Sequence, residues 1–175
     1  MPVITIGREV GAGGETVGRM LADRLHIEYL DGAIVDEVAR RLRVEKDVVE
    51  NYDERTASAF DKLLRRLATV DFSTPQDVAA WTPPYGDLAW DPHTSVLALT
   101  QEIIRQQAAS GDCVIVGRAA GYVLKNRPDL LRVFLRAPVD FRLKAIMEMR
   151  GLGVEEGRRY LKAQDANRAA YVRQV

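Results

Sequence analysis

The sequence has few of the residues on which several protein classes depend. A single cysteine, Cys113, excludes an internal disulfide; it lies in an apolar run, so we expect a core residue of a cytoplasmic protein, not a nucleophile. The two histidines, His26 and His93, are too few for a histidine-rich metal site. No apolar run is long enough to cross a membrane, and no targeting segment precedes the first apolar run. We therefore expect no membrane partner.

An excess of one charge is also missing, since 25 basic residues balance 25 acidic ones. The two signs are nevertheless separated along the chain. Residues 45–112 carry a net charge of −6, and residues 125–175 carry +6. This asymmetry favours an anionic ligand near the C-terminal third, with a solvated arginine-rich helix face as the alternative. Nucleic acid is a less favoured partner, because the basic residues lack interleaved aromatic residues.

The 175 residues, 47% of them hydrophobic, suit one domain in which strands alternate with helices. Apolar runs predict strands at 3–6, 27–30, 113–118 and 131–135. Helical patterns lie between and after them, at 15–25, 32–42, 46–51, 57–70, 95–109, 119–125, 137–150 and 154–175. This alternation predicts an α/β fold with a parallel sheet. Residues 71–92 contain prolines and aromatics and predict an irregular lid or a homodimer surface.

A glycine-dense turn between the first strand and the first helix is the strongest motif. Its residues are Gly11-Ala12-Gly13-Gly14, followed by Glu15 and Thr16. Glycines allow backbone N–H groups to converge on a phosphate, and the start of a helix favours an anion. The turn departs from the P-loop motif G-x-x-x-x-G-K-[ST], because Gly14 stands at the lysine position. Thr16 could still supply a hydroxyl near a metal ion, and Arg8 is the nearest cation.

Two other interpretations of this turn stay open. Gly11 and Gly13, with Asp31 twenty residues further on, imitate a dinucleotide-binding fingerprint. That fingerprint requires a small residue where Thr16 stands, and its first glycine follows the strand more closely. A glycine-rich turn that binds nothing is the second alternative.

Six stretches in collinear order match one family. They are Ile4–Gly14, Tyr29-Leu30-Asp31, Tyr52-Asp53-Glu54-Arg55, Cys113–Arg118, Val133–Pro138 with Phe141-Arg142, and Asp165–Arg168. In these stretches the chain resembles the cytidylate kinase-like proteins, a branch of the P-loop nucleoside monophosphate kinases. The resemblance spans nearly the whole chain, apart from residues 71–92.

The resemblance implies a three-layer P-loop fold, with a central parallel sheet and helices on both faces. It divides the single domain into a core at 1–31 and 95–150, a monophosphate-binding insert at about 32–94, and a LID-type helix pair at about 150–175. It implies ATP with Mg²⁺ as cofactors, bound at residues 8–16, and a nucleoside monophosphate opposite.

The resemblance also implies roles for individual residues. Arg118 matches an arginine that contacts the acceptor phosphate, and Asp165 and Arg168 match residues that contact the nucleotides across the cleft. Asp31 and Arg55 lie in matching stretches and are assigned to the substrate. Asp165 and Arg168 could instead form a surface ion pair between residues three apart on a helix.

Several residues depart from the family pattern. Besides Gly14, Ala119 and Gly121 stand where aspartates are usual, and Val35-Asp36 replaces a Tyr-Arg pair. The chain ends at Val175, before the family's usual fifth strand, so we expect its C-terminal end to be incomplete. Loss of the lysine can be offset if another cation reaches the same phosphate oxygens. The candidate cations are Arg8, Arg118, Arg142, Arg150, Arg158 and Arg168.

The sequence therefore predicts ATP-dependent phosphorylation of a nucleoside monophosphate. We assign catalytic roles to Arg8, Arg118, Asp165 and Arg168. One alternative is a catalytically weak nucleotide-binding regulatory module. Another is an ATP-dependent kinase of a different small acceptor.

Overall fold

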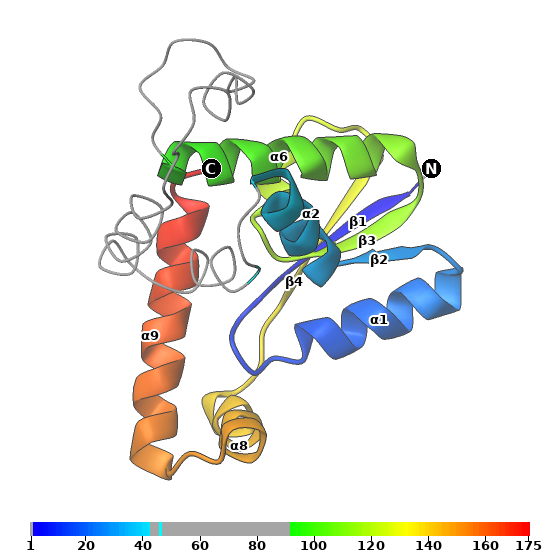
Figure 1. Ribbon diagram of the computed structural model, residues 1–175. Helices are drawn as coiled ribbons and strands as arrows, with labels where there is room; N and C mark the ends of the chain where they lie inside the picture. Colours follow the sequence, from blue (N-terminus) through cyan, green and yellow to red (C-terminus); the bar gives the residue numbers. More distant parts are fainter. Residues whose placement is uncertain (1, 43–45, 47–91) are drawn as a thin grey trace.

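The computed structural model describes residues 2–42, 46 and 92–175 (Figure 1). The segments expected at 46–51, 57–70 and 71–92 lie outside the described residues, except for Lys46 and Pro92. Arg55, assigned to the substrate, also lies outside them.

Four parallel strands form the central sheet, in the order β2-β3-β1-β4. They are β1 (Val3–Arg8), β2 (Glu28–Leu30), β3 (Cys113–Val116) and β4 (Leu130–Leu135). In the register, Val3 lies opposite both Cys113 and Leu130. All four residues of β3 are buried, as expected for a central strand covered on both faces. The predicted parallel α/β sheet is confirmed.

Helix α1 (Gly14–Leu25) covers one face of the sheet with its smallest residues. Gly14, Gly18 and Ala22 are buried, and a Cβ atom added at Gly18 would lie 2.6 Å from Cγ2 of Val116. The helix thus approaches the sheet too closely for larger side chains. The sequence pattern predicts a core-facing side made of Val17, Met20, Leu21 and Leu25. This prediction is wrong for all but Leu21, because the other three side chains are between 40% and 66% exposed.

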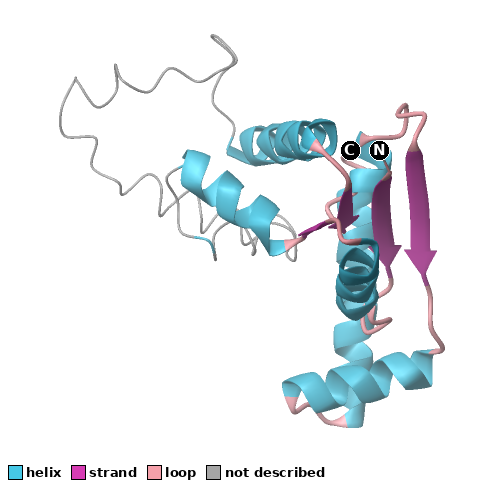
Figure 2. Cartoon of the chain, turned by 90° about the vertical axis from the view of Figure 1, so that its right-hand side faces the viewer, coloured by secondary structure: helices cyan, strands magenta, loops and turns pink. Residues whose placement is uncertain are grey.

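The opposite face is covered by α2 (Gly32–Leu42), α6 (Pro92–Ser110) and the short α7 (Ala120–Val123). Ile34 and Val38 of α2 and Ile103 of α6 are almost completely buried in one cluster with Ile115 of β3. Helices on both faces make the predicted three layers (Figures 1 and 2).

The chain continues from β4 into α8 (Val139–Arg150) and α9 (Val154–Val172). These helices pack through Leu143, Ile146 and Leu161 against Val10, which follows β1. Gly151 ends α8 in the left-handed conformation, with φ of 66°. Figure 2 shows the strands pointing toward this pair of helices, so α8 and α9 close the carboxyl end of the sheet beside the glycine-dense turn. None of the helices in the described part of the chain combines the length and the apolar character that crossing a membrane requires.

Candidate functional site

A cavity of about 1140 Å³ opens where β1 and β3 end. Residues of both strand ends line it, among them Gly7, Arg8, Gly117 and Arg118. Helix α9 supplies part of the opposite wall, including Arg168. Ligands of open parallel sheets bind at the carboxyl ends of the strands, so this cavity is the candidate site.

The structure brings six of the residues assigned from the sequence to this cavity. They are Arg8, Glu15, Asp31, Arg118, Asp165 and Arg168. Gly11-Ala12-Gly13-Gly14 and Thr16 are not among the lining residues, and Thr16 is exposed on α1. The metal role assigned to Thr16 stays a prediction without support from its position.

The glycine-dense turn has a backbone conformation that favours glycine at two positions. Gly11 and Gly13 both have φ of 76°, a conformation in which side chains are strained. A Cβ atom at Gly11 would lie 2.8 Å from the carbonyl oxygen of Arg142, whereas a Cβ at Gly13 would meet no atom within 4 Å. The loop is therefore closed on its α8 side and open at Gly13. Helix α1 begins at the next residue, so its free N–H groups are available to an anion.

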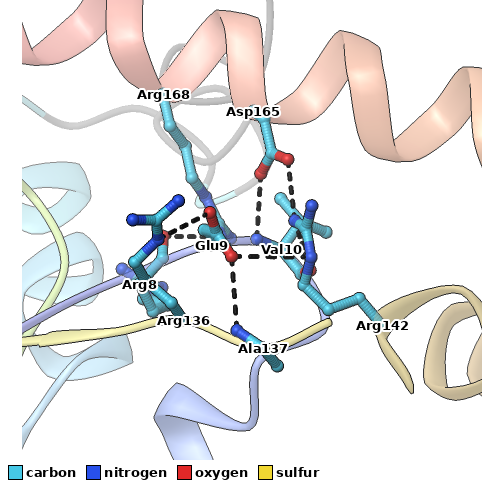
Figure 3. A network of polar contacts seen from close by, with 8 residues as sticks. All are labelled: Arg8, Glu9, Val10, Arg136, Ala137, Arg142, Asp165 and Arg168. Carbon is cyan, nitrogen blue, oxygen red and sulfur yellow. Dashed lines mark hydrogen bonds and ion pairs between the residues drawn. The ribbon is translucent and has the colours of Figure 1, made fainter. Parts of the chain in front are cut away.

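Polar contacts from α8 and α9 fix the loop from behind (Figure 3). The Val10 N–H donates to Oδ1 of Asp165 at 3.0 Å, and Nη1 of Arg142 lies 2.7 Å from Oδ2 of Asp165. The same Nη1 donates to the Val10 carbonyl at 3.2 Å. Nη1 of Arg168 donates to the Arg8 carbonyl at 3.5 Å. Asp165 thus pairs with Arg142 and contacts the loop backbone, which the sequence interpretation missed.

Arg142 is the most buried charged residue in this network. Its side chain is 8% exposed, and its Nε has no hydrogen-bond partner although Oε2 of Glu9 lies 3.6 Å away. The sequence offers Arg142 as a candidate phosphate cation. The structure instead places its guanidinium against Val10 and Asp165, so we assign Arg142 to support of the loop.

Arg118 follows β3 in a strained turn. Gly117, Arg118 and Ala119 have φ of 84°, 53° and 52°. A non-glycine residue in this region costs about 1–2 kcal/mol, and such residues concentrate at functional sites. The turn is tied to β1 by a hydrogen bond of 3.0 Å from the Gly117 N–H to the Ile6 carbonyl. Arg118 is therefore presented to the cavity by a fixed backbone.

A second polar chain runs along the α1 side of the cavity. Glu15 and Arg19 form an ion pair of 3.0 Å, and the Arg19 guanidinium lies 4.5 Å from the ring centroid of Tyr29. The Tyr29 hydroxyl lies 3.2 Å from Oδ2 of Asp31. Burial, followed by the nearby Asp31 carboxylate, raises the pKa of Tyr29 to about 12, so its hydroxyl stays a donor at neutral pH.

Two arginines at the cavity were missed by sequence reasoning. Arg19 lies on α1, and Arg132 lies on β4 between apolar residues. A charged residue inside an apolar strand was the available signal for Arg132.

The described residues supply no metal site of their own. No group of three or more histidine, cysteine, aspartate or glutamate side chains could hold an ion within the described ranges. Magnesium in nucleotide sites is bound largely by phosphate oxygens and water.

Comparison with known protein families tests the resemblance inferred from the sequence. The sequence profile of the cytidylate kinase-like family matches residues 3–175 of this chain. The chain belongs to this family. The resemblance inferred from the six sequence stretches is thus confirmed.

Two curated relatives of this family member are kinases by name. A bifunctional pantoate ligase/cytidylate kinase of Gloeobacter violaceus is 28% identical over 162 residues, which cover 86% of this chain and 30% of the relative. A cytidylate kinase of Methanopyrus kandleri is 32% identical over 69 residues, covering 35% of this chain and 36% of the relative. The chain matches only about a third of the length of these relatives.

A solved structure supports the fold. An uncharacterized protein from Eubacterium ventriosum is 21% identical, with a TM-score of 0.64, over 99% of this chain and 76% of that one. At this identity the similarity concerns the arrangement of helices and strands alone.

Proposed function

We propose that this chain transfers the γ-phosphoryl group of ATP to the phosphate of a nucleoside monophosphate. An acceptor oxygen forms a new bond to the γ-phosphorus while the bond to the bridging oxygen of ADP breaks, leaving ADP and a nucleoside diphosphate. Such a transfer requires alignment and positive charge around the moving group more than covalent help from the protein. One observation carries the proposal: a single cavity contains Arg8, Arg118 after β3, and Arg168 on α9. Arg8 lies beside the glycine-dense turn at residues 11–14, which we call the phosphate loop.

The donor is placed at the phosphate loop. Its open side at Gly13, the start of α1 and the neighbouring Arg8 together offer backbone N–H groups and one cation. These groups suit the outer phosphates of ATP.

The acceptor is placed at the end of β3. Arg118 is presented to the cavity by its fixed turn, and Asp31 lines the cavity after β2. An arginine fork can bind a terminal phosphate bidentately, and a carboxylate can accept hydrogen bonds from hydroxyl or amino groups of a nucleoside. Arg168, on the α9 wall, would then lie near the charge that develops during transfer.

A coupled ADP-release assay tests the proposal. Full-length protein with ATP and Mg²⁺ is offered CMP, dCMP, UMP, AMP and GMP in turn, and turnover with at least one of them is expected. Arg105→Ala, an exposed change on α6, serves as the matched arginine control and should retain wild-type turnover. ATP binding without turnover of any monophosphate would overturn the proposal in favour of a regulatory module. Stimulated ADP release with a different phosphorylated or hydroxyl acceptor would indicate a kinase of another substrate.

A further inference from the structure

The phosphate loop exchanges the residue types at two of its motif positions. In G-x-x-x-x-G-K, Gly13 occupies the second glycine position, so Arg8 stands at the first glycine and Gly14 at the lysine. The loop therefore has a cation at the motif's first glycine position and a glycine at its lysine position. This exchange has a steric basis in the structure.

The stem of Arg8 occupies the space beside Gly14. A Cβ atom added at Gly14 would lie 2.7 Å from Cγ, 3.0 Å from Cδ and 3.1 Å from Cβ of Arg8. Real Cβ atoms do not approach carbon atoms to 2.7 Å, and the nearby Cβ of Arg8 cannot move independently of the β1 backbone. A lysine at position 14 and an arginine at position 8 therefore compete for one space.

The guanidinium of Arg8 reaches the turn after β3. A Cβ atom added at Gly117 would fall onto Nη1 of Arg8 and lie 2.9 Å from its Cζ. Gly117 also has φ of 84°, which favours glycine independently. The Arg8 side chain thus extends from the loop to the Arg118 turn, with a glycine beside its stem and another beside its charged end.

The neighbouring acids do not neutralise Arg8 in the described part of the chain. Glu9 directs its oxygens at the Ala137 N–H, at Arg136 and at Arg142. Asp31 accepts the Tyr29 hydroxyl. Arg8 lines the cavity without an ion pair to either acid, so its charge is available to an anion.

We infer that Arg8 replaces the loop lysine as the cation that binds the outer phosphates of ATP, and that Gly14 and Gly117 are glycines because the Arg8 side chain needs their space. This inference rests on the proposed function for its ligand, whereas its steric part is independent of any nucleotide. Arg8 approaches from the β1 side, and its planar guanidinium can bind two oxygens of one phosphate through parallel N–H groups, a geometry that a lysine ammonium does not offer.

A swap of the two residues tests the inference. The variants are Arg8→Gly, Gly14→Lys and the double variant, with ATP and AMP affinities measured by titration calorimetry. Arg8→Gly should weaken ATP by about 10- to 150-fold, the equivalent of a charge-assisted hydrogen bond of about 1.5–3 kcal/mol, and AMP much less. Gly14→Lys alone should bind ATP poorly, because lysine displaces Arg8 or is excluded by it. The double variant should recover at least about tenfold of the affinity lost by Arg8→Gly.

A second lysine variant separates charge from position. Ala12→Lys places a cation in the same loop without filling the space beside Gly14, and its combination with Arg8→Gly should recover no affinity. Melting temperature without nucleotide reports the steric part. Gly14→Lys should destabilise the wild-type protein and have a smaller effect in the Arg8→Gly background.

The outcomes distinguish this inference from the proposed function. Equal ATP affinity of wild type and Arg8→Gly, or no recovery in the double variant, would overturn the inference even if turnover is observed. Equal destabilisation by Gly14→Lys in both backgrounds would overturn its steric part. A wild-type protein that binds no ATP would overturn the proposed function and the assigned ligand, while the melting temperatures would still decide the steric competition.

Discussion

The two sides of the phosphate loop differ in how their polar groups are used. Behind the loop, Asp165 and Arg142 bind each other and the Val10 backbone, and Glu9 contacts Arg142 and the Ala137 N–H. We call these the rear contacts. In front of the loop, Arg8 and Arg118 line a cavity of about 1140 Å³, whose wall also includes Glu9 and Asp165. We call these two residues the front cations.

This difference separates the residues that hold the conformation of the loop from those expected to bind an anion. Rear contacts are intramolecular and partly or wholly buried, so they act on the conformation of the loop and on the free energy of unfolding. The front cations line the cavity, and their removal should lower affinity for an anion. The predictions below test that separation, beginning with the largest expected effect.

Arg142→Met should break the rear contacts most severely. It leaves Asp165 beside the loop without its cation, and breaking a buried ion pair costs about 3–5 kcal/mol when one charge stays behind. Because the Asp165 side chain is 33% exposed, we expect the lower end, about 3 kcal/mol, seen as a melting temperature lower by roughly 6–12 °C. Arg136→Gln, in an ion pair with Glu9 whose arginine is 78% exposed, is the control and should change stability by less than about 1 kcal/mol. Equal effects of the two variants would contradict the distinction between rear contacts and surface pairs.

Gly13→Val should break the front of the loop without disturbing the rear. The added side chain occupies the open space where phosphate is expected, so ATP affinity should fall about 100-fold or more. Because Gly13 has φ of 76°, the variant should also lose about 1–2 kcal/mol of stability. Calorimetric titration of ATP measures the first effect and thermal unfolding the second. Unchanged affinity in a folded variant would remove the loop from the site.

Arg168→Ala tests a residue that takes part on both sides of the loop. It lines the cavity and also donates to the Arg8 carbonyl at 3.5 Å. If it stabilises charge that develops during transfer, kcat should fall by about 100-fold while KM for the acceptor changes little. A fall in melting temperature with unchanged kcat would instead assign Arg168 to the rear contacts.

Arg118→Ala should sharpen the role of the second front cation. Loss of its contact to the acceptor phosphate should raise KM for the best monophosphate by about tenfold, with kcat less affected. Alanine keeps the strained φ of 53°, so the substitution should leave the backbone strain of the turn unchanged. In the double variant with Arg168→Ala, the effects of the two substitutions should be less than additive if both arginines contact the same bound complex. Wild-type kcat and KM in both variants would show that Arg118 and Arg168 belong to a solvated surface and not to the active site.

Cys113 provides a buried reference that belongs to neither side of the loop. Burial raises the pKa of its thiol to about 11, so the thiolate is scarce at pH 8 and reaction with a thiol reagent should be slow. The unfolded thiol ionises near pH 8.5, which means that this contribution to stability is complete below that pH and is lost as pH rises toward 11. Thiol titration of native and denatured protein measures the effect. Fast native reaction at pH 8 would show that the start of β3 opens readily.

The sequence by itself determined the strands, the parallel sheet, the loop and the family. Val3–Arg8 and Cys113–Val116 are short β-branched runs between turn residues, and such runs have few ways to be buried other than as central strands. The loop motif also pointed to Arg8, and the family resemblance to Asp31, Arg118 and Arg168, all of which line the cavity.

Only the tertiary structure decided which contacts those residues make. The face of α1 was mispredicted because Gly14, Gly18 and Ala22 repeat with the same helical spacing as apolar residues, and only the distance to β3 selects the small ones. The rear contacts join residues up to 155 positions apart, such as Val10 and Asp165, and no local pattern encodes such a pairing. The route of the Arg8 side chain likewise depends on β1 and β3 being neighbours in the sheet, because that adjacency brings the Gly117 turn within reach of its guanidinium.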